Sequence, residues 1–213
     1  MKLYYSPGAC SLAPHIALRE ADRTFELERV DLKTRRTASG GDFLEINPKG
    51  DVPALQLDEA GDEILTETPV VLQYIADLVP DKRLAPPNLT FARYRLQEWL
   101  SFVSSEIHEP YGWLFAPDTP APTRARARGK IGERLVYIHG VLVDRGFLLG
   151  ETFSVADAYL FVMLRWCERF EIDLQEWPNL ASYYTRVLER PTVEAALGAE
   201  GLLEHHKHFR RTA

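Results

Sequence analysis

The sequence predicts an α/β domain followed by an all-helical domain. Up to about residue 78, short stretches of strand and helix character succeed one another in the order β-α-β-β-β-α. From about residue 89 onward, apolar residues recur almost entirely at helical spacing. The intervening stretch VPDKRLAPPN contains Pro80, Pro86 and Pro87, which is typical of a linker. We therefore expect a first domain at 1–78, a linker at 79–88 and a helical domain at 89–213.

The elements of the first domain follow from local patterns. Residues 2–6 form a short apolar strand, and residues 11–21 follow with apolar side chains at helical spacing. Residues 25–32 (FELERVDL) indicate a second strand, and DVPALQLD and DEILTE indicate two more around a turn. The last helix of the domain begins near Thr68, a possible N-cap, with Pro69 in its first turn.

Four helices are expected in the second domain, at about 89–116, 123–145, 154–170 and 178–190. The third begins apolar on nearly all sides, so we expect it to be the buried centre of a bundle that also encloses Cys167. Ser154 and Asp157 have the spacing of a capping box at its start.

Composition excludes several classes of protein. A net charge of −6 and a pI near 5.6 argue against nucleic acid as a partner, and Arg124, Arg126, Arg128 and Lys130 indicate a solvated helix face. No stretch is long and apolar enough to span a membrane. Two cysteines make no disulfide framework, which favours a reduced, cytoplasmic protein. The tail EHHKHF lacks the ligand spacing of a zinc site, so no metal is expected.

Cys10 stands where the first strand turns into the first helix. Free N–H groups and the helix dipole stabilise a thiolate there, so its pKa is expected to fall below about 8.5. The alternative is a small buried hydrophobe. Ala13 stands where a Cys-x-x-Cys motif would have its second cysteine. Any redox cycle at Cys10 must therefore use an external thiol, and glutathione is the abundant cytosolic one.

Two further features suit a peptide-like ligand. A cis bond at Val52-Pro53 would present the Val52 backbone to an extended peptide, although an ordinary strand-entry proline is equally consistent with the dipeptide. Glu67 and Thr68 open a helix, where a carboxylate can bind an ammonium and the hydroxyl and free N–H groups a carboxylate. Simple helix capping by Thr68 is the alternative.

The sequence resembles the bacterial beta-class glutathione transferases over nearly its whole length. The matching stretches are MKLYYSPGACSLAPHIALRE, NPKGDVPAL, LTETPVVLQYIADLVPD, EWLSFVSSEIHEPYGWLF, FSVADAYLF and RPTVEAALGAEGLL. The resemblance implies a thioredoxin-like domain joined to an all-helical domain, in a homodimer. It also implies conjugation of glutathione to small hydrophobic electrophiles, with some peroxidase and thiol–disulfide exchange activity.

The resemblance also implies site residues. Catalytic roles fall on Cys10 and His108. Contacts to glutathione fall on these two residues and on Ala9, Arg35, Val52, Pro53, Glu67, Thr68, Ser101, Ser105 and Glu106. Arg35 is the residue expected to meet the glycine carboxylate. The chain departs from the family with Arg35 in place of lysine, Asp51 in place of glutamine and Ser101 in place of asparagine.

The helix at 89–116 has its own pattern. α-Helical spacing puts Ser101, Ser104, Ser105 and His108 on one polar face. Leu96, Trp99, Val103 and Ile107 form a packing face. Tyr111, Trp113, Leu114 and Phe115 are expected to border the electrophile pocket, with core packing as the alternative. Three functions remain open: a glutathione transferase, a monothiol glutathione-dependent disulfide reductase acting through Cys10, and a non-enzymatic binding protein on the same fold.

Overall fold

The computed structural model describes residues 1–58 and 63–203 in two compact units. The first unit combines Met1–Leu84 with the segment that begins at Leu188, and the second is Ala85–Val187. Part of the turn expected between the third and fourth strands lies outside the described residues, as do the three histidines of the tail. In the described ranges, no helix combines the length and the apolar character needed to cross a membrane.

The first unit is built on a five-stranded sheet with the order β3-β2-β1-β4-β5. Its strands are β1 (Lys2–Tyr5), β2 (Glu26–Asp31), β3 (Arg36–Thr37), β4 (Ala54–Gln56) and β5 (Ile64–Thr66). β1 and β2 are parallel and joined through α1 (Leu12–Glu20), while β4 and β5 are added antiparallel. This confirms the α/β character of the first domain. β3 and α2 (Phe43–Ile46) were not predicted, because such short pieces show no periodicity.

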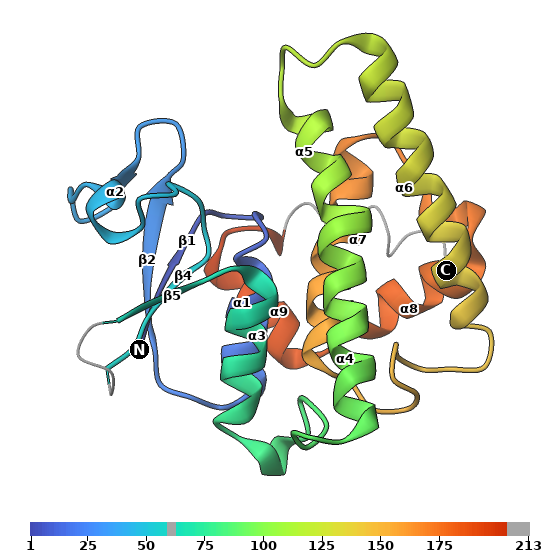
Figure 1. Ribbon diagram of the computed structural model, residues 1–213, viewed down its shortest axis with the longest axis horizontal. Helices are drawn as coiled ribbons and strands as arrows, with labels where there is room; N and C mark the ends of the chain where they lie inside the picture. The colour runs from blue at the N-terminus through green and yellow to red at the C-terminus, as the bar shows by residue number, and fades with distance from the viewer. Residues whose placement is uncertain (59–62, 204–213) are drawn as a thin grey trace. The chain divides into compact units, whose positions relative to one another are not determined.

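The two faces of the sheet bury alternate residues of each strand. Tyr4, Val30 and Ala54 pack with Phe43 of α2 on one face. Leu3 and Leu55, which are fully buried, point to the other face, where α1 and α3 (Thr68–Asp77) lie side by side (Figure 1). A short 3₁₀ helix, η1 (Pro80–Lys82), follows α3.

The helix α9 (Pro191–Ala199) belongs to the first unit, although it is the last described helix in the chain. It packs against α1, and Glu200 follows it with a buried carboxylate. That carboxylate lies 2.8 Å from His15 Nδ1 and accepts a hydrogen bond from the Gly8 N–H at 2.8 Å. The turn that precedes Cys10 is therefore fixed by a residue almost two hundred positions away in sequence.

The second unit is all helical. It contains α4 (Phe91–Phe102), the π-helical segment η2 (Val103–His108), α5 (Glu109–Phe115), α6 (Ala121–Val141), α7 (Val155–Arg169), η3 (Leu174–Glu176) and α8 (Pro178–Leu188). Nearly all of α7 is buried, as predicted for the centre of the bundle. The Asp157 carboxylate accepts hydrogen bonds from Ser154 N–H (2.8 Å), Ser154 Oγ (2.7 Å) and Leu148 N–H (2.9 Å), so the predicted capping box is confirmed.

Three side chains of the basic cluster near the start of α6 have polar partners within this unit. Arg128 donates to the carbonyls of Phe170 and Glu171, and Arg124 donates to the carbonyl of Ala116 at 3.2 Å. Lys130 lies 3.6 Å from the Glu106 carboxylate. Arg126 and Arg128 are exposed, as expected for a solvated helix face, while Arg124 and Lys130 are half-buried.

Candidate functional site

Cys10 sits in a tight turn between β1 and α1. The turn is closed by hydrogen bonds from Ala9 N to Ser6 O and from Leu12 N to Ala9 O, both 3.0 Å, with Gly8 at φ 72°. The Ser11 hydroxyl accepts from Ser6 N at 3.2 Å and donates to Ser6 O at 3.3 Å. These hydrogen bonds hold the Cys10 backbone in place just before the first helical residue, Leu12.

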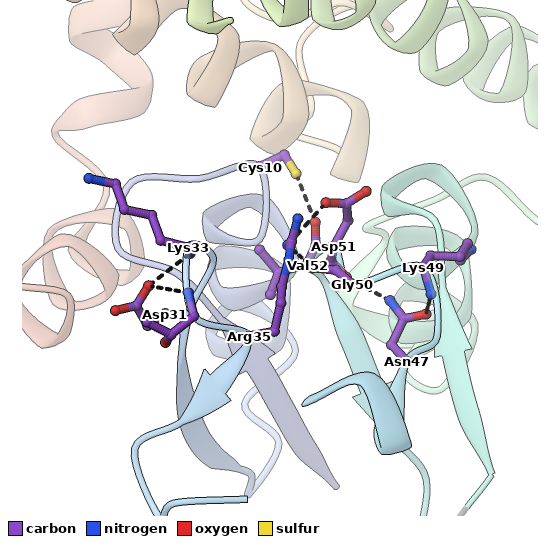
Figure 2. A network of polar contacts seen from close by, with 10 residues as sticks. Cys10, Asp31, Lys33, Arg35, Asn47, Lys49, Gly50, Asp51 and Val52 are labelled. Atoms are coloured by element: carbon purple, nitrogen blue, oxygen red, sulfur yellow. Dashed lines mark hydrogen bonds and ion pairs between the residues drawn. The ribbon is translucent and has the colours of Figure 1, made fainter. Parts of the chain in front are cut away.

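The thiol of Cys10 is enclosed. Cys10 is 9% exposed, and its Sγ donates a hydrogen bond to the Val52 carbonyl at 3.2 Å (Figure 2). Burial raises the pKa of the thiol to about 11, and the charge of Asp51 adds to that rise. The Thr68 side chain and the backbone N–H groups of Cys10 and Ser11 hydrogen-bond to the sulfur and lower its pKa, but by less.

The predicted lowering of the Cys10 pKa is therefore wrong. Helix-terminal N–H groups do act on the sulfur, as expected from its position, but desolvation outweighs them. Cys10 carries its proton at neutral pH. The protonated thiol acts as a hydrogen-bond donor to the Val52 carbonyl.

The segment before β4 supplies the backbone that faces Cys10. The Val52–Pro53 peptide bond is cis, which decides between the two alternatives that the dipeptide left open. Asn47 Nδ2 donates to the Asp51 carbonyl at 2.7 Å, and Gly50 N–H donates to the Asn47 carbonyl at 2.8 Å. These bonds fix residues 47–53 as a rigid edge beside the thiol (Figure 2).

Arg35 reaches the same edge from the turn between β2 and β3. Its guanidinium donates to the Gly50 carbonyl and lies 3.5 Å from the Asp51 carboxylate. Figure 2 shows the Arg35 side chain running toward the peptide segment that ends at Val52. A cation is thereby placed on the same segment that faces Cys10.

Glu67 and Thr68 stand at the start of α3 with different surroundings. Thr68 is buried, 4% exposed, and contacts the Cys10 sulfur. Glu67 is exposed, adopts a positive φ of 70°, and pairs its carboxylate with Lys49 Nζ. Lys49 Nζ also donates to Thr66 Oγ1 at 2.7 Å. The Glu67 carboxylate thus binds an ammonium group of the protein itself.

The second unit holds the remaining predicted residues. His108, at the end of η2, has its Nδ1 2.6 Å from the hydroxyl of Tyr159 and its ring edge-on to Trp166. Ser105 Oγ donates to the Ser101 carbonyl at 3.0 Å. The Arg134 guanidinium hydrogen-bonds Glu106 at 2.8 Å, and this contact lowers the pKa of that carboxyl. Ser105 and Glu106 are therefore engaged within this unit.

The π-helical segment changes the geometry expected for this helix. α-Helical spacing does not apply between Val103 and His108, since a π-helix bonds residue i to i+5. The α-helical spacing that predicted a single polar face from Ser101 to His108 is therefore interrupted by the π-helical turn. The packing face is confirmed, because Leu96, Trp99, Val103 and Ile107 are all buried.

The aromatic stretch after His108 divides into two groups. Tyr111 is fully buried, and its hydroxyl lies 3.1 Å from Cys167 Sγ, while Leu114 is 5% exposed. Both side chains belong to the core of the second unit, which confirms core packing for them. Trp113 and Phe115 are 49% and 41% exposed and remain open to contact with a ligand.

Comparison with known proteins assigns the family. Residues 1–77 match the domain described as Glutathione S-transferase, N-terminal domain, and residues 87–191 match Glutathione S-transferase, C-terminal domain. The chain belongs to the glutathione S-transferase family. It is 44% identical to "Glutathione S-transferase GstA" of Escherichia coli O157:H7, over 95% of this chain and 100% of that one.

Solved structures agree with this membership of the glutathione S-transferase family. A bacterial beta-class glutathione S-transferase from Sphingomonas chungbukensis has a TM-score of 0.92 and 49% identity, covering 95% of this chain and 100% of that one. A sphingomonad glutathione S-transferase complexed with glutathione has a TM-score of 0.91 at 49% identity, with the same two coverages. The fold class predicted from the sequence, a thioredoxin-like domain with a helical domain, is confirmed.

Several neighbours of the site in this glutathione S-transferase were missed from the sequence. Lys49 pairs with Glu67, Asn47 fixes the Asp51 carbonyl, and Gly50 makes room for Arg35. The stretch NPKGD contains all three, and its density of turn-forming residues was the available signal. Among the described residues, no group of three or more His, Cys, Asp or Glu side chains is arranged to hold a metal ion.

Proposed function

We propose that this glutathione S-transferase binds glutathione at the Cys10 end of its first unit and conjugates it to small hydrophobic electrophiles. The observation that carries the proposal is the convergence of Val52 and Thr68 on the Cys10 sulfur. A peptide laid along Val52 can pair with that backbone as an added strand does. The thiol of such a peptide would then be next to a hydrogen-bond donor.

Glu67 is the proposed anchor for the α-ammonium of the γ-glutamyl group. Its carboxylate pairs with the ammonium of Lys49, which supports its use as a cation acceptor. The proposed contacts also include Ala9, Pro53 and Arg35 in the first unit. Ser101, Ser105, Glu106 and His108 are proposed from the resemblance to the family, and Ser105 and Glu106 would have to release partners within their own unit.

In the proposed reaction the glutathione thiolate attacks an electrophilic carbon. A C–S bond forms, the leaving group departs with the bonding pair, and the thiol proton passes to solvent. Cys10, as a neutral thiol, can donate its S–H to the attacking sulfur without the repulsion that a second thiolate would cause. The raised pKa of Cys10 favours this role over that of a nucleophile in a disulfide reductase.

Glu67→Gln tests the anchor. We expect glutathione binding to weaken by about 1–3 kcal/mol, the range for losing a hydrogen bond to a charged group. Calorimetry with glutathione measures this, and conjugation to an aromatic chloro-electrophile is followed in parallel. Glu63→Gln is the matched control, because it removes an exposed carboxylate from the same unit. Equal affinity in both variants would leave Glu67 as a helix-start residue only.

A homodimer in the cytoplasm is part of the proposal. α4 and α6 carry large apolar side chains in the open, with Tyr94 57% and Tyr137 53% exposed, and Tyr137 stacks on Trp99. An exposed apolar surface of this kind is typical of an interface. Sedimentation at micromolar concentration is expected to give twice the chain mass of 24.3 kDa. A stable monomer would remove the dimer from the proposal.

A further inference from the structure

The guanidinium of Arg35 lies against the backbone at Gly50. A Cβ built on Gly50 would lie 3.2 Å from Leu44 Cδ2 and 3.3 Å from both Arg35 Cζ and Arg35 Nε, so the Leu44 and Arg35 side chains would have to shift slightly to admit it. Gly50 also has a φ of 73°, which suits glycine. The close contact between Gly50 and the Arg35 guanidinium therefore depends on glycine at position 50. This contact places Arg35 next to Asp51.

Arg35 does not offer an uncompensated positive charge. Its guanidinium lies 3.5 Å from the Asp51 carboxylate and donates to the Gly50 carbonyl. Figure 2 labels two further cationic side chains, Lys33 and Lys49, and the Lys49 ammonium is engaged with Glu67 and Thr66. The negative charge of Asp51 also raises the pKa of the Cys10 thiol, so this carboxylate acts electrostatically on both Arg35 and Cys10.

If a ligand carboxylate approached Arg35, it would meet the Asp51 carboxylate, and both groups are hydrogen-bond acceptors. Carboxylates have only acceptor oxygens, so the carboxylate of a ligand must compete with Asp51 for the Arg35 donors and bear its repulsion. A primary amide has both kinds of group. Its carbonyl can accept from the Arg35 guanidinium while its N–H donates to the Asp51 carboxylate. The Arg35–Asp51 pair matches an amide on both sides.

We propose that the Arg35–Asp51 pair receives the C-terminus of the bound peptide. The site then accepts γ-glutamyl thiol peptides with an uncharged, amide-like C-terminus as well as those with a free carboxylate. The inference rests on the proposed function, since it concerns the same glutathione site. Asp51 is the residue that sets this tolerance. Arg35 alone would select the carboxylate.

The experiment compares glutathione with its C-terminal amide by calorimetry in the wild-type protein, in Asp51→Asn and in Glu63→Gln. Asp51 has a 77% exposed side chain, so its conversion to asparagine leaves the fold intact. Glu63 lies at the opposite end of β4 from Asp51, where its carbonyl accepts from Leu57 N–H. Glu63→Gln therefore changes the net charge equally without touching Arg35.

We expect the wild-type protein and Glu63→Gln to bind the two peptides within about twofold of each other. Asp51→Asn is expected to shift the ratio toward glutathione by about threefold to fivefold, the size of a partly exposed charge interaction. That shift should shrink between about 20 mM and about 200 mM salt, because salt screens exposed charges.

Two results would overturn the inference while leaving the proposed function in place. One is a wild-type protein that prefers glutathione over its amide by more than about tenfold. The other is an unchanged ratio in Asp51→Asn. If neither peptide binds the wild-type protein, the proposed function itself fails and this specificity falls with it.

Discussion

The regions around Cys10 and Cys167 each enclose a thiol, and burial raises the pKa of both, to about 11 and about 12. Their neighbours differ. Cys10 lies in a turn and donates to a backbone carbonyl, beside Thr68 and within reach of the charge on Asp51. Cys167 lies on the central helix of the second unit, and Tyr111 is its hydrogen-bond partner. Burial alone therefore does not distinguish Cys10, the thiol proposed to function, from the core thiol of Cys167. The difference lies in the backbone carbonyl and the carboxylate that act on Cys10.

Exchanging each cysteine for alanine separates the two regions most strongly. Cys10→Ala is expected to abolish thiol–disulfide exchange with a mixed disulfide of glutathione, since no other thiol of the first unit can take part. Conjugation should survive in part, supported by backbone N–H groups and His108. Cys167→Ala should keep both activities and lose stability instead, because it leaves a cavity in the core.

The decisive comparison measures conjugation and thiol–disulfide exchange on the same preparations of two variants. One is Cys10→Ala, and the other combines Cys10→Ala with His108→Ala. Complete loss of conjugation in Cys10→Ala, with glutathione binding intact, would show that this thiol activates glutathione by itself. Exchange that persists in Cys10→Ala would remove Cys10 from redox chemistry.

The pH dependence of stability gives a smaller difference. A thiol whose pKa is raised in the folded state stabilises the protein fully below its unfolded pKa of about 8.5, and this stability is lost as pH rises through the folded value. For Cys10, with a folded pKa of about 11, the loss between pH 9 and pH 11 is about 2–3 kcal/mol.

Urea unfolding of the wild-type protein and of Cys10→Ala at pH 8 and pH 10.5 measures the contribution of the Cys10 thiol. The pH-dependent change in unfolding free energy is compared between the two proteins, so the effects of other titrating groups cancel. The wild-type protein should lose more stability than the variant over this interval. Parallel pH profiles would mean that the Cys10 thiol is hydrated enough to ionise normally.

Thr68→Val gives the smallest expected effect. The Thr68 side chain lowers the pKa of Cys10, so its loss should raise that pKa further and slow alkylation of Cys10 at a fixed pH near 9. Rates with iodoacetamide, followed by peptide mass analysis, report on Cys10 and Cys167 separately. Cys167, in the other unit, serves as the internal control. Faster alkylation of Cys10 would show that Thr68 restricts access more than it stabilises the anion.

Much of the fold was predictable because it depends on local patterns. The Ser154–Asp157 capping box, the burial of α7 and the β-α-β order all follow from the spacing of residue types. The start of α3 near Thr68, with Pro69 in its first turn, was likewise visible. The expected N-cap role of Thr68 is wrong, because Glu67 is the N-cap residue and Thr68 is the first residue of the helix. α9 was not predicted as a helix, since its few residues show little amphipathic pattern and its packing against α1 is tertiary.

The candidate site was predictable in its residue types but not in its electrostatics. The sequence identified Cys10, Val52 and Thr68, which the structure brings together. The sign of the Cys10 pKa shift could not be predicted, because desolvation depends on how closely the rest of the unit surrounds the sulfur. The pairing of Lys49 with Glu67, and the π-helical segment before His108, likewise arise from contacts and backbone geometry that no residue pattern encodes.

The return of α9 to the first unit has a consequence for the order of events during synthesis. Ribosomes deliver the chain from its N-terminus, and domains generally fold as they emerge. In the turn before Cys10, the Gly8 N–H donates to the carboxylate of Glu200, which is translated after all of Ala85–Val187. The first unit, although translated first, must therefore wait for the second to emerge before its cysteine turn can reach its final form.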